Sequence, residues 1–248
     1  MTKFIVVGVQ RSGTTLIRTT LNNHSQVRCA GESFKVKRWR VAPYMGDLSY
    51  QKFLENRSYG LIARNFRKTA IVQEFLDDLY GRQHDGAIGF KFMADQHGRF
   101  PAVVPYIKEN SIKVIHVTRE NTLKIWVSIL TAKARGGFHS DGGKVVEAVK
   151  VHVPISGLLL KLNTIYEHSQ LWTGLLSESE NYTKIKYEHF VKNKASEVSR
   201  LCEFLNVGNE QAESELKKMN SDDLCNVIEN YEQVCSTLKG SRFEWCTH

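Results

Sequence analysis

The chain alternates short apolar runs with segments whose apolar residues recur at helical spacing. Strands are predicted at residues 3–9, 26–32, 87–93, 112–118 and 183–190, and the first of these runs has the β-branched composition of a buried parallel strand. Helices are predicted around residues 16–23, 69–80, 101–110, 120–137, 158–172, 195–207 and 213–238. Strands that alternate with helices indicate a parallel sheet with right-handed crossovers. The predicted fold class is therefore α/β, a P-loop-like domain with a central parallel sheet of about five strands flanked by helices.

Nothing in the sequence divides the chain into parts. The 248 residues contain no internal repeat and no linker rich in Pro, Gly or Ser, so a single domain over residues 1–248 is predicted. Residues 33–64 are basic and aromatic without clear periodicity, as expected for an excursion over the strand ends. No apolar stretch approaches the roughly 18 residues of a membrane span, and the first apolar run leads into a glycine loop, as a strand does. A cytoplasmic location is expected, and the pattern indicates no oligomeric state.

Composition narrows the possible partners. The five cysteines include no C-x-x-C pair, which disfavours a zinc site or a disulfide framework. The formal net charge of +8 suits an anionic ligand, a nucleic acid or a basic solvated surface. The run KVKRWR at residues 35–40 gathers four cations around one tryptophan. It fits a solvated face, an RNA groove or the rim of a cleft for anionic acceptors.

The sequence GVQRSGTT at residues 8–15 has the spacing of a phosphate-binding loop without the lysine of that motif. Gly8 and Gly13 occupy the glycine positions of G-x-x-x-x-G-K-S/T, and Thr14 stands where the lysine would be. Arg11 is the nearby cation, inside the loop. A loop between a strand and a helix can still bind phosphate oxygens through backbone N–H groups. The pattern therefore favours ligand binding by Arg11 over an exposed loop cation.

Polar residues also follow the other predicted strands. Because the carboxyl ends of parallel strands share one edge, these residues are expected to meet the loop. Glu32 ends the second strand and fits a general base, a surface carboxylate or an arginine partner. Lys91 in the third strand fits an acid for a leaving phosphate or an ion-pair partner of Glu32. Arg119 follows the fourth strand, and Tyr187 near the fifth fits either cofactor contact or aromatic packing.

Two histidines and an aspartate lie near the same strands. His116 stands between two apolar residues and is predicted to pack in the core, whereas His97 fits an exposed position and, less well, a catalytic one. Asp95 lies past the end of its strand. A Mg²⁺-dependent phosphoryl transferase needs an aspartate at a strand end and usually the loop lysine, so no metal site is predicted. Sulfuryl transfer fits better, because fixed arginines and amides can neutralise its smaller charge.

Four segments together resemble sulfotransferases that use 3′-phosphoadenosine 5′-phosphosulfate (PAPS). VGVQRSGTTLIRTTLNNHSQVRCAGE resembles their 5′-phosphosulfate loop, first helix and second-strand carboxylate. VIHVTRENTLKIWVSIL resembles their 3′-phosphate motif, an arginine at a strand end and a serine on the following helix. GFKFMADQ and IKYEHFVKNKASEVSRLCEFLNV match the later strands and helices, so the resemblance runs from Lys3 to about Val207.

The resemblance implies roles for the matched residues. The 5′-phosphosulfate would bind to residues of the loop, which are Arg11, Ser12, Gly13, Thr14 and Thr15. Arg119 and Ser128 would bind the 3′-phosphate; Tyr187 is assigned to the cofactor from its place near the fifth strand and not from the resemblance. Glu32 resembles the general base of carbohydrate and tyrosyl-protein members. In the expected transfer Arg11 stabilises the departing phosphate, and Lys91 either assists it or pairs with Glu32.

One spacing departs from part of the family and leaves the acceptor open. Ser128 lies one residue farther from Arg119 than in the cytosolic steroid and phenol enzymes, and their catalytic histidine has no clear counterpart here. Ser128 follows Arg119 by about two and a half helical turns, so its side chain faces the strand end only if the helix begins a little after Arg119. The spacing is similar to Nod-factor-type carbohydrate enzymes, and the loop to tyrosyl-protein enzymes. A saccharide hydroxyl is the first expectation and a tyrosine or small alcohol the second, while a nucleotide kinase and a non-catalytic polyanion binder remain alternatives.

Overall fold

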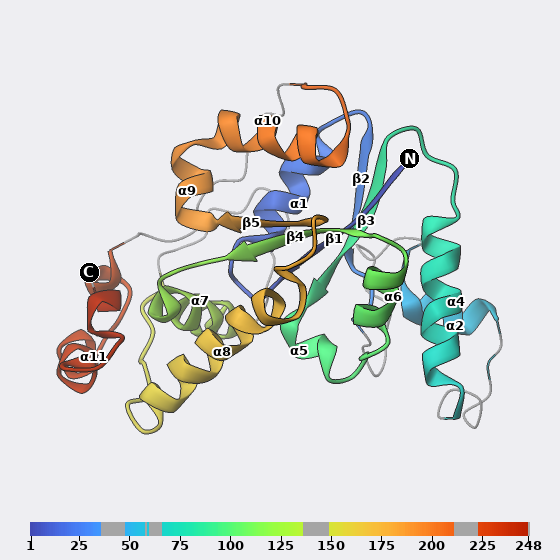
Figure 1. Cartoon of the computed structure of the whole chain (residues 1–248). Coiled ribbons are helices and arrows are strands. Elements are labelled where there is room, and N and C mark those ends of the chain that lie inside the picture. The colour runs from blue at the N-terminus through green and yellow to red at the C-terminus, as the bar shows by residue number, and fades with distance from the viewer. Residues whose placement is uncertain (36–47, 58, 60–65, 136–148, 211–222, 248) are drawn as a thin grey trace.

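Five parallel strands form the centre of the molecule (Figure 1). The computed structural model describes the chain except residues 36–47, 58, 60–65, 136–148, 211–222 and 248. The strands are β1 (Thr2–Gly8), β2 (Val27–Glu32), β3 (Ala87–Met93), β4 (Lys113–Thr118) and β5 (Tyr182–Lys186), in the order β2-β3-β1-β4-β5. β1 is the middle strand, which explains why its apolar run is buried on both faces. The predicted α/β fold with a five-stranded parallel sheet is confirmed.

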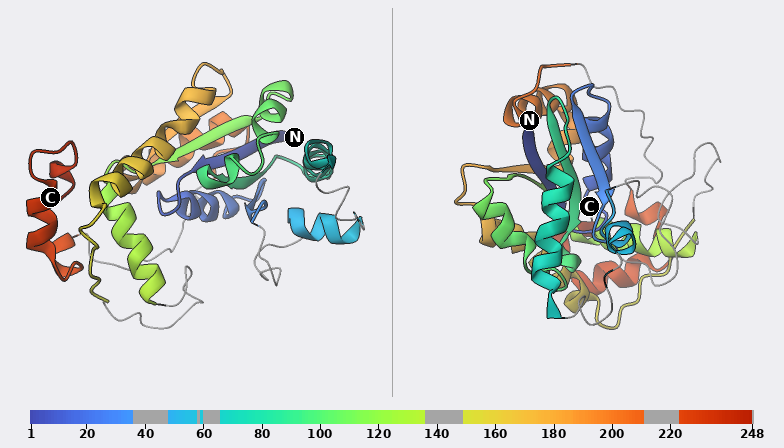
Figure 2. Two further views of the ribbon diagram at one scale, coloured as in Figure 1. Left: turned by 90° about the horizontal axis from the view of Figure 1, so that it is seen from below. Right: turned by 90° about the vertical axis from the view of Figure 1, so that its right-hand side faces the viewer.

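Helices cover both faces of the sheet (Figure 2). One face packs against α1 (Thr14–Asn22), α9 (Tyr187–Lys192) and α10 (Lys194–Leu205). The other packs against α4 (Lys68–Tyr80), α6 (Val103–Glu109) and α8 (Leu158–Leu176). The remaining helices are α2 (Tyr50–Asn56), α5 (Ala94–His97), α7 (Thr122–Ala134), η2 (Leu224–Asn226), α11 (Tyr231–Leu238) and η3 (Glu244–Thr247).

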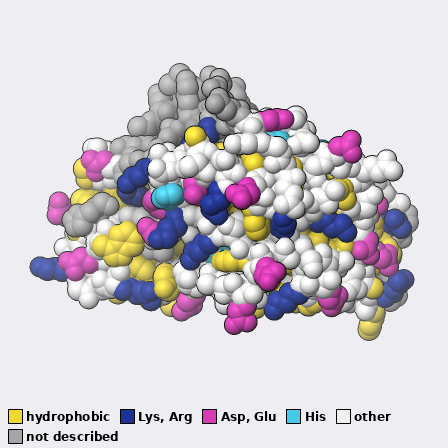
Figure 3. All heavy atoms as spheres, turned by 45° about the horizontal axis from the view of Figure 1, so that its top comes forward, with side chains coloured by type: hydrophobic (Ala, Val, Ile, Leu, Met, Phe, Trp, Pro, Cys, Tyr) yellow, Lys and Arg dark blue, Asp and Glu magenta, His cyan; other side chains and the backbone are white. Residues whose placement is uncertain are grey.

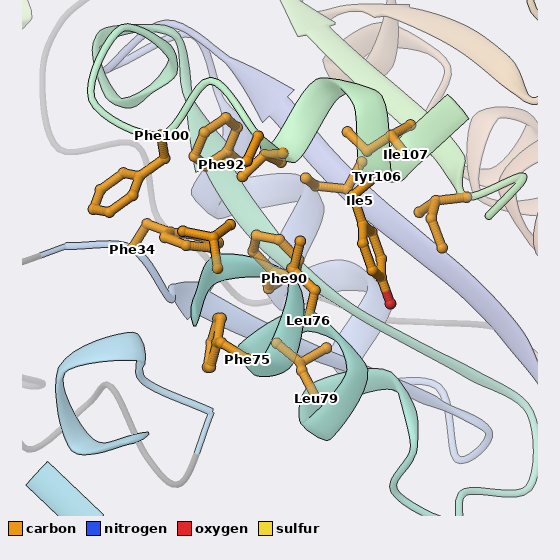
Figure 4. Packing of buried hydrophobic residues seen from close by; sticks show 14 of the residues in the cluster. Ile5, Phe34, Phe75, Leu76, Leu79, Phe90, Phe92, Phe100, Tyr106 and Ile107 are labelled. Atoms are coloured by element: carbon orange, nitrogen blue, oxygen red, sulfur yellow. The ribbon is translucent and has the colours of Figure 1, made fainter. Parts of the chain in front are cut away.

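An aromatic cluster fixes the chain where β2 ends (Figure 4). Phe34 is 1% exposed, and its ring centroid lies 4.8 Å from that of Phe100 and 5.2 Å from that of Phe75. Phe90 and Phe92 of β3 complete the contacts at 5.7 and 5.4 Å. Tilted and edge-to-face aromatic pairs of this kind add stability beyond their buried area. The backbone between Glu32 and residue 35 is therefore held against the sheet.

The C-terminal segment secures the start of α7. This segment, with η2, α11 and η3, lies at the opposite end of the molecule from α2 and α4 (Figures 1 and 2). The Asn121 side chain caps α7 by accepting a hydrogen bond from the Lys124 N–H at 2.9 Å. Its amide nitrogen donates to the Cys246 carbonyl oxygen at 2.8 Å. The residues before α7 are thus tied to the chain end.

The differences from the sequence prediction lie outside the sheet. α2 and α5 were not expected, since residues 33–64 lack periodicity and α5 spans only 4 residues. The fifth strand ends at Lys186, and Tyr187 begins a helix instead of continuing the strand. The tail is not one helix, because η2 and α11 are separated by a bridge from Val151 to Ile228. The rest of the predicted tail helix, the glycine pair after α7 and residues 36–40 lie outside the described residues.

Among the described residues, no helix combines the length and the apolar character needed to cross a membrane.

Candidate active site

The loop after β1 adopts the conformation that its glycine spacing predicts. Arg11 has φ +66° and Gly13 has φ +102°, both in the left-handed region. The Ser12 hydroxyl donates to the Val9 carbonyl at 2.8 Å and closes the loop on itself. α1 begins at Thr14, so its first backbone N–H groups have no acceptor within the helix. The loop therefore presents backbone donors and the positive end of a helix dipole to an anion.

Gly13 cannot carry a side chain in this loop. A Cβ at Gly13 would lie 2.5 Å from Cδ2 of Tyr187, and the φ of +102° is strained for any other residue. We expect Gly13→Ala to lower the free energy of unfolding by about 1–3 kcal/mol, which lowers the Tm by several degrees in thermal unfolding. Gly174→Ala is the matched control: it lies in α8 with nothing within 4 Å, and alanine should stabilise that helix. An unchanged Tm in Gly13→Ala would contradict the observed loop.

A bulge in β2 turns the Glu32 carboxylate toward the loop. Ala30 pairs with Phe90 and Glu32 pairs with Lys91, so Gly31 is an extra residue in β2. In a regular strand Gly31 would pair with Lys91, and Glu32 would lie opposite Phe92 on the other face of the sheet. The bulge instead brings Glu32 Oε1 to 3.7 Å from Lys91 Nζ.

Lys91 joins the carboxylate to the loop. Its side chain is 5% exposed, and its Nζ donates to the Thr15 hydroxyl at 3.1 Å. Burial lowers the pKa of Lys91, while the Glu32 carboxylate opposes that lowering. Of the two functions that the sequence left open for Lys91, the ion pair with Glu32 is present, and a lowered pKa also suits a proton donor. One ammonium group therefore links β3, the helix α1 and the end of β2.

Arg119 lies at the end of β4 with its guanidinium over the Tyr187 ring, 4.8 Å from the centroid. Its Nε is 4.0 Å from Glu188 Oε1, too long for a hydrogen bond. Within the described part of the chain, this buried Nε has no hydrogen-bond partner. A buried arginine donor without an acceptor is costly, so the position suits an anionic ligand.

Arg11 connects the loop to α7. Its Nε donates to the Ser128 hydroxyl at 2.9 Å, so Ser128 does face the strand ends. This agrees with the condition set by the sequence, because α7 begins only at Thr122. Burial, and then the positive charges of Arg119 and Arg135, lower the pKa of Arg11. Sequence reasoning missed Arg135, although it lies seven residues after Ser128, about two helical turns, and therefore on the same face of α7.

These side chains surround one cavity of about 300 Å³. All but one of the predicted site residues line it, namely Arg11, Gly13, Thr14, Thr15, Glu32, Lys91, Arg119, Ser128 and Tyr187. Ser12 is fully buried beneath the loop. Three further residues complete the lining, namely Gln10, Lys35 and Met93. Four cationic side chains and one carboxylate therefore face the same space.

The histidines and Asp95 lie apart from this arrangement. His116 is fully buried, its Nδ1 is 2.6 Å from the Tyr182 hydroxyl, and burial lowers its pKa to about 3, as fits the predicted core position. His97 packs edge-on against Trp172, and burial lowers its pKa as well. Asp95 accepts a hydrogen bond from Gln10 at 3.2 Å.

Several solved structures share this fold. The sulfotransferase from Alicyclobacillus acidocaldarius is 14% identical, with a TM-score of 0.50 over 100% of this chain and 96% of that chain. The sulfotransferase domain from the curacin biosynthetic pathway is 17% identical, with a TM-score of 0.53 over 91% and 82%. Mouse sulfotransferase SULT7A1, complexed with PAP, is 12% identical, with a TM-score of 0.50 over 99% and 87%. No curated protein matches the chain by sequence.

The family comparison covers nearly the whole chain. The description of the matching family is "Sulfotransferase domain", and the match extends over residues 1–243. It includes the loop, Glu32, Lys91, Arg119 and Ser128, the residues on which the resemblance rested. The chain belongs to the sulfotransferase domain family and is a sulfotransferase.

Proposed function

We propose that this protein transfers the sulfuryl group of PAPS to a hydroxyl of a saccharide acceptor, by in-line transfer without a metal ion. The contact series Thr15–Lys91–Glu32 carries the proposal, with Lys91 Nζ 3.1 Å from the Thr15 hydroxyl and 3.7 Å from the Glu32 carboxylate. The Glu32 carboxylate therefore lies close to the phosphate-binding loop, with the Lys91 side chain between them. A base and a leaving-group site on either side of a transferred group are what in-line displacement needs.

The donor site is assigned to the loop after β1, the end of β4, α7 and the start of α9. PAPS supplies the sulfuryl group, and 3′,5′-bisphosphoadenosine is what leaves. The loop residues Arg11 to Thr15 hold the 5′-phosphosulfate through backbone N–H groups and the Arg11 guanidinium. Arg119 and Ser128 hold the 3′-phosphate, which fits the buried Arg119 Nε that lacks an acceptor. Tyr187 supports the Arg119 guanidinium and borders the nucleotide.

Each residue then has one task in the transfer. Glu32 accepts the proton of the acceptor hydroxyl as the new oxygen–sulfur bond forms. The bond from sulfur to the 5′-phosphate oxygen breaks, and its electron pair leaves on that oxygen. Arg11 and the N–H groups of Thr14 and Thr15 stabilise the charge that develops there. Lys91, with its lowered pKa, donates a hydrogen bond to the same departing phosphate.

The alternatives are less well supported by the site. A phosphoryl-transfer enzyme needs a loop lysine, and Thr14 occupies that position. A polyanion binder needs a continuous basic surface, whereas on the face in Figure 3 Lys and Arg alternate with Asp and Glu. A tyrosine or small-alcohol acceptor would use the same chemistry at the same site.

We expect 3′,5′-bisphosphoadenosine without metal to raise the Tm by about 5–10 °C at about 100 times its Kd. AMP lacks the 3′-phosphate and should give a much smaller shift, and ATP with Mg²⁺ should give no larger shift than AMP. Thermal unfolding of the whole chain with each ligand measures this. A larger rise in Tm with ATP and Mg²⁺ would support a kinase. Equal rises with all three ligands would contradict a specific site for the 3′-phosphate.

A further inference from the structure

Both oxygens of the Glu32 carboxylate face ammonium groups. Oε1 lies 3.7 Å from Lys91 Nζ, and Oε2 lies 3.6 Å from Lys35 Nζ. The Lys35 N–H donates to the Glu32 carbonyl at 2.9 Å, so a tight turn returns the Lys35 side chain to the carboxylate. Phe34 lies between Glu32 and Lys35 in the sequence, and its burial among other aromatic rings holds the turn in place. The contact with Lys35 is therefore built into the backbone after β2.

The two ammonium groups differ in their freedom to move. The Lys91 side chain is 5% exposed and also donates to Thr15, whereas the Lys35 side chain is 29% exposed. An acceptor hydroxyl must come within hydrogen-bond distance of one Glu32 oxygen to lose its proton. Oε1 is held by the buried lysine on the loop side. An acceptor that approaches the more exposed Oε2 meets the Lys35 ammonium group, 3.6 Å from that oxygen.

We infer that Lys35 is a specificity-determining residue that covers the Glu32 base and moves away when the acceptor brings an anionic group of its own. The acceptor class is a saccharide with a carboxylate or sulfate on the same sugar as the reacting hydroxyl, or on the next one. That anion pairs with Lys35 and exposes Oε2 to the hydroxyl. An uncharged acceptor has no anion that could replace Glu32 as the partner of Lys35. It must therefore break the Lys35–Glu32 ion pair without forming a new one.

The charges that line the cavity support this assignment. Of its four cationic residues, Arg11, Lys91 and Arg119 lie at the loop, beneath it and at the end of β4, where the donor's phosphates are assigned. Lys35 lies on the other side of Glu32 from Lys91. It is the lining cation that the donor leaves unused, and it stands beside the oxygen that the acceptor needs.

The inference rests on the proposed function and changes none of its chemistry. The hydroxyl proton passes to Glu32 Oε2, the acceptor oxygen bonds to sulfur, and the electron pair of the broken bond leaves on the 5′-phosphate. Lys35 exchanges one anionic partner for another. Its effect is on which acceptor is used, not on the bonds that form.

The test compares methyl hexuronosides with the corresponding methyl hexosides, which differ by a carboxylate in place of CH₂OH. Labelled sulfate transfer from PAPS is measured for the wild type, Lys35→Met, Lys35→Arg and, as a distant exposed control, Lys108→Met. The wild type should prefer the hexuronosides at least about tenfold in kcat/KM. Lys35→Met should lose about tenfold on hexuronosides and gain on hexosides, because Oε2 is then open to both. Lys35→Arg should keep the wild-type preference.

Binding gives a readout that does not depend on turnover. With 3′,5′-bisphosphoadenosine bound, hexuronosides should raise the Tm of the wild type more than that of Lys35→Met. Equal losses on both sugars, or transfer to neither while the bisphosphate still stabilises the protein, would overturn the role of Lys35 and leave the donor site intact. If the bisphosphate itself gives no specific shift, the proposed function fails independently, since Lys35 takes no part in donor binding.

Discussion

Glu32→Gln should lower kcat by about 10²–10⁴-fold and leave 3′,5′-bisphosphoadenosine binding unchanged. Glutamine has nearly the same shape, so the bulge at Gly31 and the packing of Phe34 are kept, but its amide oxygen cannot take a proton from a hydroxyl. The donor contacts are assigned to the loop, Lys91, Arg119 and Ser128, none of which lies in β2. Sulfate transfer under single-turnover conditions, together with the bisphosphate-induced rise in Tm, measures both parts of the prediction.

An altered protonation state of Lys91 must be separated from the loss of the Glu32 carboxylate in this experiment. Glu32 raises the pKa of Lys91 against the effect of burial, so Glu32→Gln lowers that pKa further. At alkaline pH Lys91 could therefore lose its proton in the variant and contribute a loss of its own. Measuring the loss at successively lower pH separates the two effects, because the contribution of Lys91 deprotonation shrinks as the pH falls and the loss that remains belongs to Glu32.

Glu120→Gln is the matched control, since Glu120 follows β4 and pairs with Lys186 on the surface. It should keep wild-type turnover. Full turnover in Glu32→Gln would remove Glu32 as the base. A lost bisphosphate shift in that variant would instead mean that the carboxylate holds the loop together through Lys91.

The sequence predicts the sheet and the residues at its edge, because both follow from local patterns. A buried run such as residues 3–9 has no alternative to a central strand, and a residue directly after such a strand can only lie at the carboxyl edge. The glycine spacing likewise predicts a phosphate-binding loop between a strand and a helix, but not the positive φ of Arg11. These inferences need no knowledge of which strands are neighbours.

The orientation of Glu32 could not be predicted in this way. A regular strand would have turned its side chain to the opposite face, and the bulge that reverses it depends on how β2 pairs with β3, a contact between residues about 60 positions apart. Lys35 was assigned only to a basic run, because its return to Glu32 depends on the burial of Phe34 among aromatic side chains from α4 and β3. Tertiary packing fixed both positions.

One contact joins the two halves of the proposed donor site. The hydrogen bond from Arg11 to Ser128 connects the loop assigned to the 5′-phosphosulfate with the helix assigned to the 3′-phosphate. Arg119 and Arg135 both lower the pKa of Arg11, so three guanidinium groups repel one another in this region. An anion placed among them relieves that repulsion, and the binding of the 3′-phosphate should therefore also order Arg11 for the transfer.

Arg119→Ala should weaken the binding of 3′,5′-bisphosphoadenosine by about 100-fold and the binding of AMP by less than about threefold. A hydrogen bond from a guanidinium to a phosphate contributes about 1.5–3 kcal/mol, and each 1.4 kcal/mol is tenfold in affinity. The buried Arg119 Nε lacks an acceptor among the described residues, so the wild type is already prepared to donate. AMP has no 3′-phosphate and cannot use this donor.

Isothermal titration with both nucleotides separates a lost phosphate contact from a damaged site. Removing Arg119 also removes the support of the Tyr187 ring, which packs against Gly13, so a general disturbance of the loop would weaken AMP as much as the bisphosphate. Arg28→Ala, on the exposed side of the edge strand β2, should bind both like the wild type. If Arg119→Ala loses affinity for both nucleotides equally, Arg119 supports the loop and the 3′-phosphate must be bound elsewhere. A loss confined to the bisphosphate assigns that phosphate to Arg119.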